Sequence, residues 1–424
     1  MKFTDCRKGG VELSSEGFKN EIPPEVIERV RDIVSGVQKR GDEAVKEFTE
    51  RFDNFSTDEL GLEIPLSELK EAYNTIDKDL RDALIHAADR IKAFHEEQKE
   101  ESWQKKDAYG SVLGQLINPI EKAGLYIPGG KAIYPSSVLM NGIPAKIAGV
   151  NEIIMVVPTP NGELNPVVLA AAHIVGVDRV FRVGGAQAVA ALAYGTETIP
   201  KVDKVVGPGN IYVATAKQLL FGTIDIDMFA GPSEILIIAD KTAKAEYIAA
   251  DMLSQAEHDE LASSIFVTDD YDLAKEVEIE VKKQTELSPR KAVVEASLNN
   301  FGEIIVVADI ATAIAVSNER GPEHLEIMVE NPEKYLKDIK NAGAVFLGDY
   351  SPEPIGDYIA GPNHVLPTMG TSRFFSPLGV YDFVKKTSVI HLSRETFDRV
   401  KSDAIIIADV EGLDAHARSM RIRN

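Results

Sequence analysis

Hydrophobic positions in the first hundred residues recur with the period of amphipathic helices. Such stripes cover residues 26–37, 45–52, 66–76 and 80–94. Pro23 and Pro24 precede the first stripe and Gly41 follows it, as expected for the start and the end of a helix. The pattern therefore predicts that this part of the chain is nearly all helix.

From Ala123 onward, short β-branched runs alternate with alanine-rich helical runs, separated by glycine and proline. The expected strands are 124–127, 153–157, 179–183, 204–206, 235–239, 265–268, 304–307, 325–329 and 345–347. The expected helices between them are 137–150, 164–175, 187–194, 210–221, 243–257, 271–287, 310–318 and 332–339. This alternation is typical of parallel sheets with helices on both faces. We therefore expect two α/β units, with the early helices packed on one of them.

Composition narrows the functional classes. The 424 residues suffice for two or three hydrophobic cores, and a net charge of −21 disfavours nucleic acids and anionic membranes as partners. The first residues carry charges where a secretory signal would be apolar, and no apolar run approaches the ~20 residues of a membrane span, so we expect a cytoplasmic protein. Cys6 is the only cysteine, which excludes an internal disulfide, and its polar surroundings argue against a catalytic thiolate.

Three glycine-rich turns, 128–130, 184–187 and 207–210, follow expected strands and lead towards helices. Glycine lets backbone N–H groups approach an anion, and a helix N-terminus adds a positive dipole, so such turns suit a pyrophosphate. The carboxyl ends of parallel strands meet at one edge, so the turns could form a single cofactor site. None has the G-x-G-x-x-G spacing, and ordinary strand-end turns are the alternative.

Gln255 and His258 lie three apart near the end of an expected helix, so both project from one face. This spacing could hold a metal ion; a solvated or packed histidine at a helix end is the alternative. Asp357 and His416, from two other polar clusters, could complete a mixed nitrogen and oxygen ligand set that suits zinc or a similar ion.

Glu323 and His324 are adjacent in the cluster GPEHLE. A carboxyl and an imidazole side by side could supply two proton-transfer groups of different pKa to one site. The alternative is an acid at a helix start beside a surface imidazole.

Long motifs along nearly the whole chain match one family. They are GLYIPGG (124–130), YPSSVLMNGIPAKIAGV (134–150), GGAQAVAALAYGT (184–196), VVGPGN (205–210), AGPSEILIIAD (230–240), LSQAEHD (253–259), GPEHLE (321–326), GDYIAGPNHVLPT (356–368) and EGLDAHARS (411–419). The chain resembles the histidinol dehydrogenases, zinc- and NAD-dependent oxidoreductases that end histidine biosynthesis. Their reaction oxidises L-histidinol through L-histidinal to L-histidine with two NAD and one zinc ion per site.

The resemblance implies roles for individual residues. The zinc ligands would be Gln255, His258, Asp357 and His416. The catalytic pair would be Glu323 and His324, and the NAD contacts would be Tyr126, Gln187 and Asn210. The substrate contacts would be Ser233, Gln255, His258, His324, Asp357, His364, Glu411 and His416.

The resemblance also implies an architecture. The family fold is similar to that of aldehyde dehydrogenases, with two incomplete Rossmann-like parallel-sheet units, a helical N-terminal part and a small swapped C-terminal segment. The domains would be an N-terminal segment 1–21, a first α/β domain 22–125 with 235–378, a second α/β domain 126–234 carrying the NAD turns, and a dimerisation segment 379–424. The protein would be a homodimer with shared active sites, so Glu411 and His416 would come from the partner subunit.

Three other functions stay open on the sequence. A related enzyme could oxidise another polar alcohol with the same zinc and NAD apparatus, although His364 and Glu411 favour histidinol. A binding protein could keep the fold without activity, but the intact Glu323 and His324 pair argues against this. A thiol-dependent aldehyde dehydrogenase would need Cys6 as its nucleophile.

Overall fold

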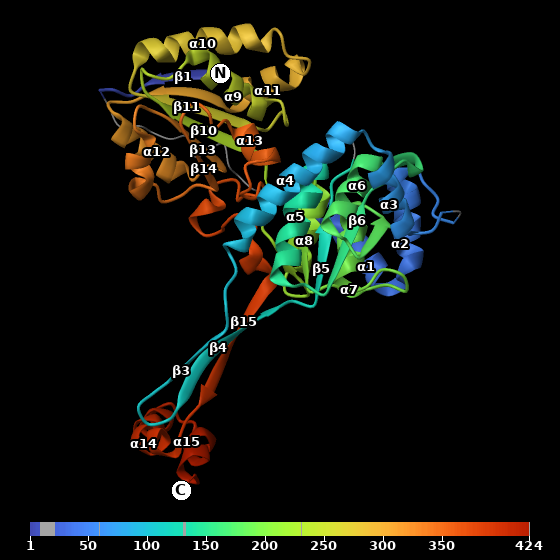
Figure 1. Cartoon of the computed structure of the whole chain (residues 1–424), viewed down its shortest axis with the longest axis vertical. Helices are drawn as coiled ribbons and strands as arrows, with labels where there is room; N and C mark the ends of the chain where they lie inside the picture. The colour runs from blue at the N-terminus through green and yellow to red at the C-terminus, as the bar shows by residue number, and fades with distance from the viewer. Residues whose placement is uncertain (9–21, 59, 130–132, 230, 424) are drawn as a thin grey trace. The chain divides into compact units, whose positions relative to one another are not determined.

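The computed structural model describes residues 1–8, 22–58, 60–129, 133–229 and 231–423 (Figure 1). The chain forms two compact units. The larger unit comprises Met1–Gln98 and Glu121–Phe383, and the smaller unit comprises Lys99–Ile120 and Val384–Asn424. Among the helices that the structure describes, none combines the length and the apolar character that crossing a bilayer requires.

The first sheet of the larger unit, here the N-terminal sheet, has the strand order β2-β7-β6-β5-β8-β9. Its strands are β2 (Glu63–Ile64), β5 (Lys122–Tyr126), β6 (Glu152–Val157), β7 (Arg179–Arg182), β8 (Lys204–Val206) and β9 (Asp225–Ile226). All pairs are parallel except β2 with β7. The central strands are buried on both faces, which is why they consist of continuous apolar runs.

Helices cover this sheet. Those within its chain segment are α5 (Pro135–Ala148), α6 (Pro166–Val175), α7 (Gly185–Tyr194) and α8 (Ile211–Leu220). The early helices are α1 (Pro24–Arg40), α2 (Asp42–Asp53), α3 (Leu66–Thr75) and α4 (Lys78–Glu96), which confirms the predominantly helical start. The apolar stripes of α1 and α2 join the core formed by α7 and α8, while α3 packs on α6 and α4 on α5.

The expected domain boundaries stay a prediction. That prediction grouped residues 22–125 with 235–378, whereas α1 and α2 share their hydrophobic core with the N-terminal sheet. An amphipathic stripe shows that a helix covers something apolar, but not which of two sheets it covers.

The second sheet, here the C-terminal sheet, is all parallel with the order β1-β12-β11-β10-β13-β14. Its strands are β1 (Lys2–Asp5), β10 (Glu234–Ala239), β11 (Ser263–Thr268), β12 (Gly302–Val306), β13 (His324–Met328) and β14 (Ala344–Leu347). One face packs on α9 (Ala245–Ala256), α10 (Tyr271–Thr285) and α11 (Lys291–Phe301). The other face packs on α12 (Ile310–Arg320), and the short α13 (Glu353–Tyr358) follows β14 (Figure 1).

Two mainly parallel sheets with helices on both faces confirm the predicted α/β fold class. The structure adds α11 and turns the expected helix 332–339 into the 3₁₀ helix Pro332–Asp338. The expected N-terminal segment 1–21 contributes β1, which pairs with β12, and its residues 9–21 lie outside the described part of the chain.

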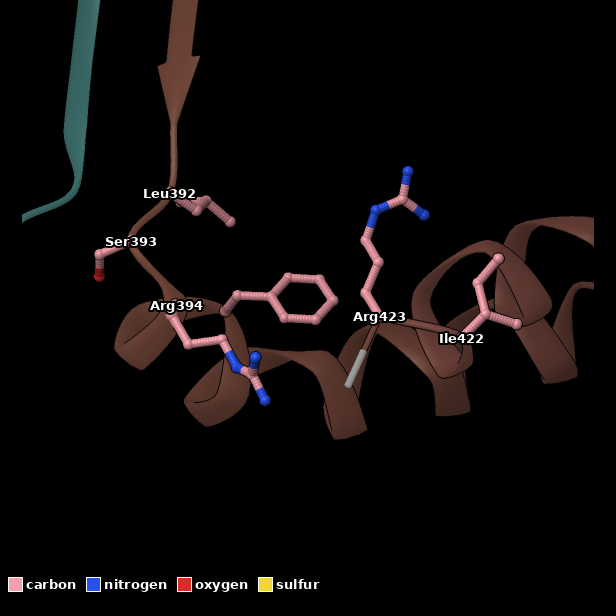
Figure 2. A pocket seen from close by; sticks show the side chains of 6 residues that line it. Leu392, Ser393, Arg394, Ile422 and Arg423 are labelled. Atoms are coloured by element: carbon pink, nitrogen blue, oxygen red, sulfur yellow. The ribbon is translucent and has the colours of Figure 1, made fainter.

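The smaller unit joins two distant stretches of sequence. Strands β3 (Trp103–Lys106), β4 (Val112–Pro119) and β15 (Val384–His391) form an antiparallel sheet, and α14 (Arg394–Val410) and α15 (Asp414–Arg421) follow. Ser393 caps α14 by accepting a hydrogen bond from the Thr396 N–H. Figure 2 shows a hollow lined by residues from the start of α14 and the end of the chain, namely Leu392, Ser393, Arg394, Phe397, Ile422 and Arg423. None of them is an expected site residue.

Candidate active site

Each sheet of the larger unit has a switch point, where successive strands are added on opposite sides. In the N-terminal sheet the switch point lies between β5 and β8, and in the C-terminal sheet between β10 and β13. Ligands of open α/β sheets bind outside the carboxyl ends of the strands at such a point. The predicted cofactor residues follow this rule, whereas the predicted catalytic residues lie at the amino ends of β10 and β13.

Two glycine-rich turns meet Tyr126 at the carboxyl edge of the N-terminal sheet. The Tyr126 hydroxyl accepts a hydrogen bond from the Gly185 N–H at 3.0 Å, and burial raises the pKa of this phenol to about 12. Gly207 has φ +114°, and a Cβ on it would lie 2.1 Å from the Tyr126 carbonyl oxygen. Only glycine allows this close approach of the two backbones. The third turn, 128–130, ends outside the described residues.

Gln187 and Asn210 occupy the first turns of helices at this edge. Gln187 is buried in α7, and its side-chain oxygen has no hydrogen-bond partner among the described residues. Asn210 is exposed and caps α8, accepting hydrogen bonds from the N–H groups of Tyr212 at 3.0 Å and Val213 at 3.2 Å. The start of a helix suits a pyrophosphate because of its positive dipole, and at α8 the N–H groups of Tyr212 and Val213 are held by Asn210.

At the amino edge of the C-terminal sheet, Glu234, Glu323 and His324 come together from adjacent strands. The Glu234 N–H donates to Glu323 Oε2 at 2.9 Å. The His324 ring lies with Nδ1 2.9 Å from the Glu234 carbonyl oxygen, which makes Nδ1 the protonated nitrogen. Nε2 therefore carries the lone pair, and it has no partner among the described residues.

Burial sets the protonation of this pair. It lowers the pKa of His324 to about 4, an effect that Asp357 opposes and His258 and His364 reinforce. It raises the pKa of Glu323 well above its ordinary value. The lowered pKa keeps the imidazole of His324 neutral, so that Nε2 can accept a proton, while the carboxyl of Glu323 holds its proton more tightly than an ordinary glutamate.

Further buried carboxyls lie beneath His324. Glu353 Oε1 is 3.6 Å from His324 Nε2, and Glu326 Oε1 accepts from the Glu353 N–H at 2.6 Å. Burial raises the pKa of Glu353 to about 8, that of Asp251 to about 6 and that of Glu326 well above its ordinary range. The sequence predictions missed these three acids. The available signals were the two-residue spacing of Glu326 from His324 in a strand and the four-residue spacing of Glu353 from Asp357 in a helix.

The expected ligands of the larger unit lie around the same place. Gln255 is fully buried near the end of α9, and neither amide atom has a partner among the described residues. His258 is exposed just beyond α9 and lies close enough to lower the pKa of both His324 and His364. Asp357 Oδ1 is 3.8 Å from His364 Nδ1, which donates to the Asp357 carbonyl oxygen at 3.0 Å.

The three remaining expected site residues lie outside the strands and helices that carry this cluster. Ser233 directly precedes β10, next to Glu234. Glu411 and His416 are exposed residues of the smaller unit, at the end of α14 and in α15. Cys6 lies beside the core of the C-terminal sheet, and burial raises the pKa of its thiol, which is unsuited to a nucleophile.

The polar groups at this edge fit a metal ion. Ligand atoms of His324, Glu353 and Asp357 all lie within 4.8 Å of one another. Gln255 adds a buried amide with no partner among the described residues, and buried polar groups of this kind need a ligand. This nitrogen and oxygen set suits zinc, and Asp357 belongs both to this triad and to the expected ligand set.

Comparisons with known proteins agree with this architecture. A family model described as histidinol dehydrogenase matches residues 19–424. A histidinol dehydrogenase of Syntrophotalea carbinolica is 54% identical over 424 residues, covering 100% of this chain and 98% of that protein. One of Aquifex aeolicus is 53% identical over 428 residues, covering 100% and 99%. The crystal structure of histidinol dehydrogenase from Elizabethkingia anophelis is 35% identical with a TM-score of 0.93, covering 100% and 98% of the two chains.

The two-sheet fold and these relatives define an α/β oxidoreductase. The chain belongs to the histidinol dehydrogenase family.

Proposed function

We propose that the protein oxidises L-histidinol through L-histidinal to L-histidine, using two NAD molecules and one zinc ion per site. This is the last step of histidine biosynthesis, and we place it in the cytoplasm. Besides the family, the observation that carries the proposal is the buried His324, whose Nδ1 is engaged by the Glu234 carbonyl while Nε2 is available as a base.

The zinc ion would be held by Gln255, His258 and Asp357 together with His416 of the partner subunit. Bound there, zinc would bind the amino and imidazole nitrogens of the substrate and so fix the position of the reacting carbon. The buried and unpartnered amide of Gln255 supports this assignment. Ser233 and His364 would contact the substrate from the larger unit.

Tyr126, Gln187 and Asn210 would bind NAD at the carboxyl edge of the N-terminal sheet. NAD supplies the hydride acceptor for each of the two oxidations. The switch point between β5 and β8, with glycine turns on both strands, supports this assignment.

His324 would accept the alcohol proton at Nε2 during the first oxidation. Glu323 would then activate a water molecule for addition to the aldehyde, and its position is fixed by the N–H of Glu234. Burial raises the pKa of Glu323 well above its ordinary value, which makes the carboxylate a stronger base than that of an exposed glutamate. His324 would act again when the resulting hydrate is oxidised.

The active site would be shared between the subunits of a homodimer. Glu411 and His416 lie in the smaller unit and are exposed, as residues that complete the site of a second copy would be. Mixing His258→Ala subunits with His416→Ala subunits should restore part of the activity, because some sites would then contain neither substitution. Mixtures as inactive as the separate variants would refute the shared site.

The reaction is tested by counting NADH formed per histidinol consumed. We expect two NADH for the natural protein, loss of turnover after removal of metal with a chelator, and recovery on adding zinc. Glu323→Gln should stop after one NADH, because a carboxamide cannot activate water.

Full activity of the metal-free protein would refute the zinc site, and faster oxidation of small or sulfonated diols would indicate another polar alcohol as substrate. Cys6→Ala should retain wild-type activity, since no thiol takes part.

A further inference from the structure

Two buried charged side chains hold the backbone of Gly207. Its N–H donates to Asp227 Oδ2 at 2.7 Å, and its carbonyl oxygen accepts from Lys217 Nζ at 2.9 Å. Lys217, from α8, and Asp227, after β9, also form an ion pair, with side chains only 4% and 2% exposed. Both polar groups of this one residue are therefore engaged by the same buried pair.

Stability alone does not account for such a pair. Removing two charges from water is costly, and apolar residues of similar size are often at least as stabilising. Asp227 is moreover fully used, because its Oδ1 also accepts from the Met228 N–H at 2.7 Å. The pair thus fixes the orientations of the two peptide groups that meet at the Gly207 Cα, which an apolar contact could not do.

Gly207 lies at the switch point of the N-terminal sheet. Gly207 directly follows β8, packs on the backbone of Tyr126 and has the left-handed φ of +114°. Three residues later Asn210 begins α8. The orientation of Gly207 therefore decides where turn 207–210 and the start of α8 lie relative to Tyr126.

We propose that Lys217 and Asp227 are positioning residues of the dinucleotide site, which hold turn 207–210 in the conformation that receives the pyrophosphate of NAD. This inference rests on the proposed assignment of this edge to NAD. Neither side chain would touch the cofactor, since both lie beneath the turn, each hydrogen-bonded to Gly207.

The test measures NADH binding to the full-length protein by fluorescence titration, alongside KM for NAD and kcat. Lys217→Met removes the charge and keeps the length of the side chain. Asp227→Asn keeps the shape but can accept at only one of the two positions where Asp227 now accepts. We expect each variant to bind NADH roughly tenfold more weakly or worse, with KM for NAD raised and kcat at saturating NAD close to wild type.

Lys204→Met is the matched control. Lys204 is 7% exposed and pairs with Asp225 at 2.8 Å, but it lies at the amino end of β8, away from the turn. This variant should lose comparable stability in thermal unfolding and bind NADH normally. If Lys217→Met does not fold, Asp227→Asn decides the question.

Wild-type NADH affinity in the Lys217 and Asp227 variants would overturn the inference, and so would equal weakening in the Lys204 control. If the natural protein itself does not bind NADH, the assignment of this edge to NAD fails and the inference falls with it. The two failures are distinguishable because the first leaves binding by the natural protein intact.

Discussion

The two switch points of the larger unit use opposite means to present polar groups. At the β5–β8 edge, the N–H groups of Gly185 and Gly207 are held by the Tyr126 hydroxyl and the Asp227 carboxylate. The buried charges Lys217 and Asp227 are paired with each other. At the β10–β13 edge, the polar groups belong to side chains. Burial raises the pKa of Glu234 and Glu323 and lowers that of His324, which favours the uncharged form of each.

This difference separates binding from chemistry. A turn that binds an anion through N–H groups needs a fixed backbone, which paired charges and glycine provide. Proton transfer needs groups whose pKa values are shifted to suit the reaction. Burial away from a compensating charge shifts them. Variants at the two edges should therefore have separable effects, on cofactor affinity at one and on turnover at the other.

The largest effect is expected at His324. His324→Asn removes the imidazole at the amino end of β13, and kcat should fall by ~10²–10⁴-fold, the usual contribution of a positioned base. NADH affinity should stay unchanged, because the residues proposed to contact NAD lie on the other sheet. Stopped-flow absorbance at 340 nm measures the rate. His86→Asn, on the exposed face of α4, is the control, and near-wild-type turnover in His324→Asn would contradict the assignment.

An intermediate effect is expected at Gly207. In Gly207→Ala the new Cβ would meet the Tyr126 carbonyl oxygen in a left-handed backbone conformation, so the turn must shift. Strain of this kind costs about 1–3 kcal/mol, visible in denaturant unfolding, and NADH affinity should fall while kcat at saturating NAD changes little.

Gly222→Ala, in the turn between α8 and β9, is a matched control. Gly222 has φ +95°, but no atom lies within 4 Å of the position of its Cβ. It should show backbone strain without weaker NADH binding. If Gly207→Ala and Gly222→Ala bind NADH with equal affinity, the close approach of Gly207 to Tyr126 does not control cofactor binding.

The smallest effect concerns pH and Glu234. Burial raises the pKa of Glu234 to about 7 from an ordinary 4.5, so folding favours the protonated form. The resulting stabilisation is complete below pH ~4.5 and is lost as the pH rises through about 7. In metal-free protein this loss should be on the order of 2 kcal/mol.

Glu234→Gln keeps a hydrogen-bonding amide without a titrating proton. Its free energy of unfolding, from denaturant titrations between pH 5 and 8, should decline less with pH than that of the natural protein. Glu260→Gln, at an exposed position, should leave the decline unchanged. Parallel curves for the natural protein and Glu234→Gln would contradict the shifted pKa.

Local patterns predicted much of this molecule. The buried strands β6 and β10 consist of apolar runs after a first glutamate, so their places in the chain were clear. The adjacency of Glu323 and His324 predicted an acid and base pair, which stays a prediction. Strands β4 and β15 were missed because they are only partly buried, and their pairing joins residues far apart in the chain.

The sequence by itself determined which segments become helices and buried strands, because hydrophobic periodicity is a local property of the chain. It also determined the glycine turns and the family. Only the tertiary structure decided that Glu353 lies close to His324, that Lys217 and Asp227 both bind the backbone of Gly207, and that Glu323 and His324 lie at the amino edge of their sheet. Those relations depend on which groups, far apart in the sequence, share one low-dielectric environment. Their burial and their mutual distances are set only when the chain folds.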